Sequence, residues 1–329
     1  MFFQKEVDQL DLIVLMRFGS HLYGTGTENS DSDYKGVFMP TIEQILLGNI
    51  PKSYHWTTKK TKEEGVRNSS DDEDIEIYSL HYFIKLACEG QTVALDMLHA
   101  PDNMVINNSL IWEEILWNRK RFYTKNLQAF IGYAKRQASK YGIKGSRLND
   151  VGTVIDFMEN YAPESKLRDI WDKFPKGEHI SYVQDTPQGV RQIEICGKIL
   201  QETATIEHSL PTLKKYHDNY GDRAKKAASN IGVDWKAVSH ACRAAYQVKE
   251  LLTENTITYP LKEAEFLKEV KAGKLDYMTR VSPILESLME EVEELSAKSD
   301  LPDKVDRKFW NEFIVAKLME KHFSPTIKL

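Results

Sequence analysis

The chain has 329 residues and a formal net charge of −5. Apolar residues make up 41% of it and charged residues 28%, a composition that is typical of a folded globular protein and excludes a disordered polar chain. The negative net charge excludes nucleic-acid binding through overall charge, so any such binding needs a local basic patch. The length predicts two domains, or one large domain with an extension.

The cysteines and the apolar runs indicate the compartment. Cys88, Cys196 and Cys242 are scattered without metal-site spacing, which favours a reducing compartment and buried thiols. The apolar run at 12–16 is too short for a signal peptide and lacks a cleavage site. No apolar run approaches the length of a membrane span. We therefore expect a cytoplasmic protein without a membrane partner.

The first hundred residues have the pattern of a mixed α/β region. Apolar or alternating segments predict strands at 10–18, 34–40, 53–58 and 74–80. Short helices are expected at 41–48, where a threonine precedes an apolar turn, and at 80–90.

From about residue 107 the apolar spacing is mainly helical. An exception near 178–206 has two alternating segments around "DTPQG", which predict a β-hairpin insertion. We therefore expect an α/β domain over 1–105 and a mainly helical domain over 106–329. Four aromatic residues at helical spacing are expected in the core: Trp112, Trp117, Trp310 and Phe313.

The stretch "GSHLYGTGTENSDSD", residues 19–33, lies between the first two predicted strands. Gly19 allows a phosphate to approach the backbone, and the Ser20 hydroxyl can donate to a phosphate oxygen. Asp31 and Asp33 are two residues apart, so on a strand both carboxylates face one side and can bind hard divalent cations. Each pair alone is more often an ordinary polar turn; only the combination indicates a metal and phosphate site.

A third carboxylate is expected from the segment "DIEIYSL", residues 74–80. Asp74 and Glu76 share one face there, and either could bind a second metal ion and accept a proton from an incoming hydroxyl. Two such ions can stabilise the attacking and leaving oxygens of a phosphoryl displacement. Such a site works mainly by positioning and electrostatics.

These motifs resemble the Gly-Ser and Asp-x-Asp signature of the DNA polymerase β-like nucleotidyltransferases. Further segments resemble the RNA-repair-pathway family within that superfamily. They are the segments that flank these motifs, and "KAVSHACRAAYQVKELL", "EVKAGKLDYMTRV" and "SDLPDKVDRKFWNEF". The resemblance covers about 10–100 and 232–315. The segment 145–230 matches less well and is a candidate insertion.

The resemblance implies an α+β fold, with a small mixed sheet and helices followed by a helical C-terminal domain. It implies transfer of a nucleoside monophosphate from an NTP to an acceptor hydroxyl, with release of pyrophosphate. Two Mg²⁺ ions are implied, for which Mn²⁺ could substitute, and the implied acceptor is an RNA end. The alternatives are transfer to a protein or a small molecule, and a non-catalytic nucleotide-binding module.

The resemblance also assigns individual residues. Gly19 and Ser20 correspond to the family's phosphate-binding pair. Asp31, Asp33 and Asp74 correspond to its metal ligands. Glu76 is a rival of Asp74 for the third carboxylate. The arginine that usually follows the Asp-x-Asp pair is Lys35 here, which can still face a phosphate as a point charge.

Two basic segments complete the expected site. Lys236, His240 and Arg243 share one helix face, resemble the family's Lys-x3-His-x2-Arg pattern and are expected at the triphosphate or the acceptor. The polar face of a packed helix would explain them too. Residues 125–147 alternate basic and aromatic side chains, which predicts either contact with an RNA backbone or a plain amphipathic helix.

Overall fold

The computed structural model describes residues 3–28, 30–58, 71–125, 145–177, 179–228, 230 and 233–323. The chain divides into two compact units. The first comprises 1–136, 235–274 and 284–329, and the second comprises 137–234 and 275–283. Within the described residues, no helix is both long and apolar enough to cross a membrane.

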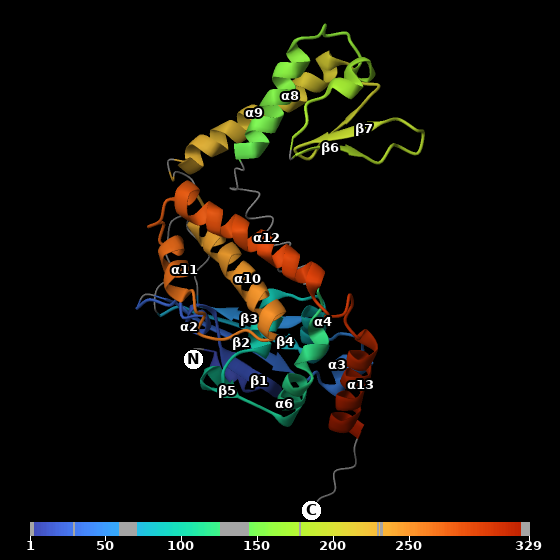
Figure 1. The fold of residues 1–329 in the computed structure, drawn as a ribbon. Coiled ribbons are helices and arrows are strands. Elements are labelled where there is room, and N and C mark those ends of the chain that lie inside the picture. Colours follow the sequence, from blue (N-terminus) through green and yellow to red (C-terminus); the bar gives the residue numbers. More distant parts are fainter. Residues whose placement is uncertain are drawn as a thin grey trace, which may run out of the picture. The chain divides into compact units, whose positions relative to one another are not determined.

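The first unit is built on a five-stranded mixed sheet of order β3-β4-β2-β1-β5 (Figure 1). Its strands are β1 (Leu12–Arg17), β2 (Ser32–Phe38), β3 (Ser53–Thr57), β4 (Glu73–Ser79) and β5 (Val105–Asn107). β2 and β4 run parallel, and the other neighbouring pairs are antiparallel. The expected α+β fold is confirmed. The strand β5 was not predicted, because three residues carry too little periodicity to be recognised.

Helices surround this sheet (Figure 1). They are α1 (Gln4–Val7), α2 (Gly19–Tyr23), α3 (Ile42–Leu46), α4 (Leu80–Cys88), α5 (Thr92–Leu98), α6 (Leu110–Trp117), α10 (Trp235–Glu254), α11 (Ala264–Lys271), α12 (Ser282–Lys298) and α13 (Arg307–Phe323). The predicted helix after β2 is α3. It begins with a capping box in which the Thr41 side chain accepts from the Gln44 backbone N–H at 3.2 Å.

The expected domain boundary near residue 105 does not coincide with the division between the two units. The C-terminal helix α13 returns to the first hundred residues, where His322 Nε2 lies 2.8 Å from the carbonyl oxygen of Pro40. On the same helix, Lys317 forms a 2.5 Å ion pair with Glu114 of α6. These contacts join the end of the chain to the α/β part in one unit.

Alternation along β4 sorts its side chains between the two faces of the sheet. Ile75 and Ile77 are fully buried in a cluster with Leu15 and Phe38. Because side chains alternate along a strand, the acidic residues between them project from the other face. The apolar cluster therefore fixes the direction in which the acidic side chains of β4 point.

One of the four aromatic residues expected in the core is exposed. Trp112, Trp310 and Phe313 are buried, whereas Trp117 is 90% exposed. Trp117 ends α6, which turns Trp112 and Ile115 inward and leaves the face of Leu110 and Trp117 in solvent. The prediction was therefore wrong for Trp117, because it lies on the face of α6 that it shares with the exposed Leu110, while the face of Trp112 and Ile115 packs into the core.

The second unit contains α8 (Gly145–Glu159), α9 (Ile206–Ala228) and an antiparallel sheet of β6 (Ile180–Val183), β7 (Gln192–Ile195) and β8 (Lys198–Gln201). The first two strands lie on either side of the predicted turn at 185–189, and β8 adds a strand that the hairpin prediction lacked. Most of the basic segment at 125–147 lies outside the described residues.

Candidate active site

The chain turns sharply at the end of β1. Gly19 begins α2 with a φ of +63°, in the left-handed region that favours glycine. A Cβ atom placed on Gly19 would lie 2.8 Å from the carboxyl carbon of Asp33 and collide with its oxygen. The backbone N–H of Phe18 donates to the carbonyl oxygen of Asp33 at 2.8 Å. The Gly-Ser pair and the Asp-x-Asp pair, 14 residues apart in sequence from Gly19 to Asp33, are therefore in contact.

The register of the parallel pair β2 and β4 selects between the two candidate third carboxylates. Asp33 lies opposite Asp74, and Lys35 lies opposite Glu76. Paired residues of neighbouring strands project from the same face, so Asp74 is the acidic side chain beside Asp33. The geometry favours Asp74, as the resemblance does, over Glu76.

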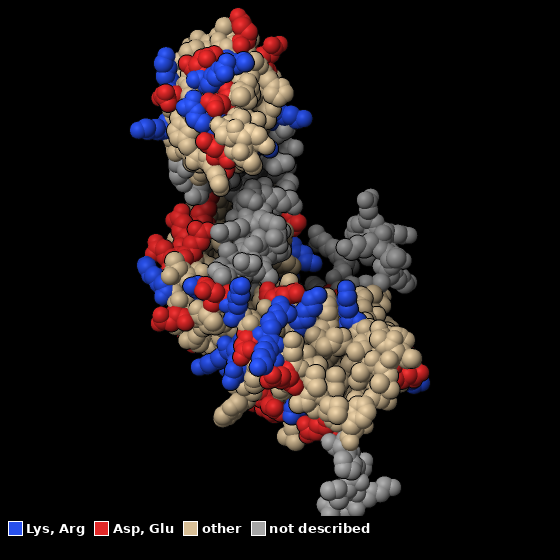
Figure 2. Space-filling view, turned by 90° about the vertical axis from the view of Figure 1, so that its right-hand side faces the viewer, with Lys and Arg blue, Asp and Glu red and all other residues tan. Residues whose placement is uncertain are grey.

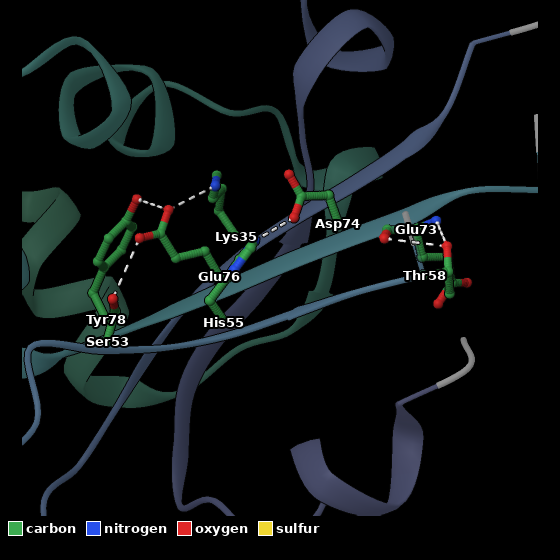
Figure 3. A network of polar contacts seen from close by, with 8 residues as sticks. All are labelled: Lys35, Ser53, His55, Thr58, Glu73, Asp74, Glu76 and Tyr78. Atoms are coloured by element: carbon green, nitrogen blue, oxygen red, sulfur yellow. Dashed lines mark hydrogen bonds and ion pairs between the residues drawn. The ribbon is translucent and has the colours of Figure 1, made fainter. Parts of the chain in front are cut away.

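Glu76 instead belongs to a polar network with Lys35 (Figure 3). Lys35 Nζ lies 2.9 Å and the Tyr78 hydroxyl 2.6 Å from Glu76 Oε2, and the Ser53 hydroxyl lies 3.3 Å from Oε1. Burial alone would raise the pKa of Glu76, but hydrogen bonds from Tyr78, Lys35 and Ser53 outweigh it and lower the pKa. Lys35, expected at a phosphate, has its charge compensated by Glu76 here.

Asp74 has a partner that the sequence did not reveal. His55 of the edge strand β3 places its Nε2 atom 2.5 Å from Asp74 Oδ1 (Figure 3). The antiparallel register puts Thr57 directly opposite Asp74 and His55 opposite Glu76, so the His55–Asp74 bond is diagonal. One feature of the sequence could have indicated this contact. The alternation of "SYHWT" places His55 on the acidic face once β3 and β4 are known to pair.

Two polar atoms at the start of α2 are buried without a hydrogen-bond partner among the described residues, Ser20 Oγ and His21 Nε2. Burial and the Arg17 guanidinium lower the pKa of His21, and nearby Asp31 opposes them. Asp31, which precedes β2, therefore lies beside α2. An unpaired buried hydroxyl is costly, and a phosphate oxygen would satisfy it.

The donor set fits a hard cation. Asp31, Asp33 and Asp74 supply carboxylate oxygens, which are the ligands that Mg²⁺ prefers. Among the described residues, no three His, Cys, Asp or Glu side chains converge as a ready-made metal cluster. The three aspartates therefore offer suitable chemistry around the Gly19 turn without forming a closed ligand set.

Comparison with known proteins is consistent with this arrangement. The model of the RNA repair pathway DNA polymerase beta family (RlaP) matches residues 3–154, which include the turn and all three aspartates. An uncharacterized 38.9 kDa protein of Enterobacteria phage T4, from the nrdC-mobD intergenic region, is 38% identical over 95% of this chain and 98% of its own length. The chain belongs to the RNA repair pathway DNA polymerase beta family.

Membership of the RlaP family supports transfer of a nucleoside monophosphate as the general reaction, and identifies the chain as a transferase. A solved nucleotidyltransferase-like protein from Exiguobacterium sibiricum is also similar, over 98% of this chain and 79% of its own. Its TM-score of 0.26 and identity of 5% are too low to add to the argument.

The basic face of α10 contacts α2 in this RlaP protein through Arg243. The Arg243 guanidinium carbon lies 3.8 Å from the centre of the Tyr23 ring, at the end of α2. Lys236 is exposed and His240 is half-buried on the same helix. Of the three α10 residues expected at the nucleotide, Arg243 thus contacts the element that carries Ser20.

A buried carboxylate anchors this contact. Asp96 of α5 is fully buried and accepts hydrogen bonds from Tyr23 and Tyr259, each at 2.7 Å, and from Gln247 at 2.8 Å. Burial raises the pKa of Asp96, and the Arg243 guanidinium and these three donors oppose that rise. The network joins α2, α5 and α10, so it holds the C-terminal end of α2 in place.

We expect Asp96→Ala to lower the free energy of unfolding by about 3–5 kcal/mol, because it removes the carboxylate that offsets the buried Arg243 charge and leaves the Tyr23 and Tyr259 hydroxyls without their acceptor. Urea denaturation followed by circular dichroism measures the change. Asp96→Asn keeps one acceptor oxygen and should cost less than half as much. A loss below about 1 kcal/mol in Asp96→Ala would show that the network contributes little.

Proposed function

We propose that this protein is a Mg²⁺-dependent nucleotidyltransferase that moves a nucleoside monophosphate from an NTP to a hydroxyl at an RNA end. The observation that carries the proposal is the contact of Gly19 with Asp33 and the pairing of Asp33 with Asp74. It joins a phosphate-binding turn and two carboxylates from different strands at one position. Those are the groups that nucleotidyl transfer requires.

Each residue has a distinct task in the proposed reaction. Ser20 Oγ donates to a phosphate oxygen of the NTP, and Asp31, Asp33 and Asp74 would hold the cation. Mg²⁺ bound there would offset the negative charge on the attacking and leaving oxygens. The acceptor oxygen forms a bond to the α-phosphorus as the bond to the β-phosphate breaks and pyrophosphate leaves. Asp74 takes the proton of the acceptor hydroxyl.

An RNA acceptor is supported by the family's description and by local charge. Figure 2 shows Lys and Arg side chains gathered on one face of the first unit, with acidic side chains among them. A chain of net charge −5 needs such a local patch to bind a phosphate backbone. Cys88, Cys196 and Cys242 are buried and none of the three forms a disulfide, which supports a reducing, cytoplasmic setting.

The acceptor can be identified with NTPs that carry a label at the α-phosphate. We expect label on RNA ends when the protein is incubated with Mg²⁺, each NTP, and a panel of RNAs, proteins and small alcohols. EDTA and the double variant Asp31→Ala/Asp33→Ala should abolish transfer. The control Asp172→Ala/Asp300→Ala removes two exposed carboxylates outside the site and should retain it.

Other outcomes contradict parts of the proposal. Label on protein or on a small alcohol, with none on RNA, would show that the acceptor is not RNA. The proposed reaction, nucleotidyl transfer, would still hold. No transfer to anything, together with nucleotide binding that is unchanged in Asp31→Ala/Asp33→Ala, would identify a non-catalytic nucleotide-binding module.

A further inference from the structure

The His55–Asp74 hydrogen bond is diagonal, and it is separate from the network around Glu76. His55 lies opposite Glu76 in the β3–β4 register, yet its ring reaches Asp74. Glu76 already accepts from Lys35, Tyr78 and Ser53 (Figure 3). The imidazole contacts the carboxylate two residues along β4 instead.

The donor in this bond follows from the chemistry of the two groups. An ionised carboxylate can only accept hydrogen bonds, so His55 Nε2 carries the hydrogen and donates it to Asp74 Oδ1. An aspartate on a strand can rotate about both of its side-chain torsions. A hydrogen bond to one named oxygen restricts that rotation and sets the direction of the carboxylate.

We infer that His55 is a positioning residue that orients the Asp74 carboxylate for metal binding and proton transfer; the inference rests on the proposed function. A small error in the placement of a reacting group is costly, and loss of a residue that orients a metal ligand typically reduces metal affinity or activity about 10–100-fold. His55 acts through Asp74 and need not contact the substrate.

The position of His55 makes the inference testable without disrupting the core. Its side chain is 53% exposed and lies on the edge strand β3, so replacing it removes little packing. Glutamine at the same position carries an amide N–H that can donate to the same oxygen, whereas alanine cannot. His208→Ala changes an exposed histidine in the second unit and serves as the matched control.

The experiment measures kcat and KM for the NTP, and the affinity of the full chain for Mn²⁺ by calorimetry. In His55→Ala we expect kcat to fall about 10–100-fold and Mn²⁺ to bind about tenfold more weakly. KM and the melting temperature should stay near the wild-type values. His55→Gln should recover most of the loss, and His208→Ala should match the wild-type protein.

The results separate this inference from the proposed function. If the wild-type protein transfers no label, the proposed function fails, and the Mn²⁺ affinities alone decide the role of His55. Equal Mn²⁺ affinities in wild type and His55→Ala, or no Mn²⁺ binding by either, overturn the inference. A fully active His55→Ala, or a His55→Gln that is as impaired as His55→Ala, also overturns it.

Discussion

Asp74→Asn should reduce kcat for nucleotidyl transfer by about 10²–10⁴-fold, because it removes the proposed proton acceptor and one metal ligand. The affinity for the NTP should change little, since Ser20 and the Gly19 turn are untouched. Asparagine has nearly the volume of aspartate and replaces a partly exposed side chain, so the fold should persist. Single-turnover transfer and equilibrium nucleotide binding measure the two effects separately.

Glu76→Gln is the matched control, since it removes a carboxylate of the same strand face two residues away. The register places Glu76 opposite Lys35, so we expect transfer to continue in this variant. Glu76→Gln should instead change the free energy of unfolding. The pKa of Glu76 is lowered in the folded protein, so its stabilising contribution is present above the unfolded-state pKa. That contribution is lost as the pH falls through the folded-state pKa, and Glu76→Gln should remove this part of the pH dependence.

The pair of variants decides between the two carboxylates. If Glu76→Gln abolishes transfer and Asp74→Asn does not, Glu76 is the third carboxylate and the interpretation of the register is wrong. Loss of transfer in both variants with intact folding would mean that the Lys35–Glu76 ion pair also supports the reaction.

Gly19→Ala should abolish transfer and weaken NTP binding, because the added methyl group would collide with the Asp33 carboxylate. Either Asp33 or the turn must move, which separates the proposed phosphate-binding pair, Gly19 and Ser20, from the carboxylates. The positive φ adds a backbone cost of about 1–2 kcal/mol for a residue with a side chain. We therefore expect a decrease in the free energy of unfolding of about 2–4 kcal/mol, measured by urea denaturation.

Gly48→Ala separates the backbone cost of a positive φ from the collision with a neighbouring side chain. Gly48 has a φ of +66°, close to the +63° of Gly19, but a Cβ atom there would meet nothing within 4 Å. It should show only the backbone cost and keep full transfer activity. If Gly19→Ala is no more destabilising than Gly48→Ala and remains active, the contact between Gly19 and Asp33 has no role in the site.

Local patterns in the sequence predicted much of the fold and part of the site. Alternation in "DIEIYSL" indicated a strand and placed Asp74 and Glu76 on one face, as the structure shows. The Gly-Ser and Asp-x-Asp pairs were found from their residue types and spacing. These features could be predicted because the periodicity of a strand and the chemistry of a turn depend on residues that are close in sequence.

The tertiary structure decided which of these residues meet. The choice of Asp74 over Glu76 beside Asp33 depends on the register of β2 and β4, and the partner of Asp74 depends on the pairing of β3 with β4. Register is set by which apolar side chains fill the core between strands about forty residues apart, so the periodicity of either strand cannot supply it. Which face of a helix packs inward likewise depends on distant elements, so only the packed structure placed Arg243 on Tyr23 and left Trp117 in solvent.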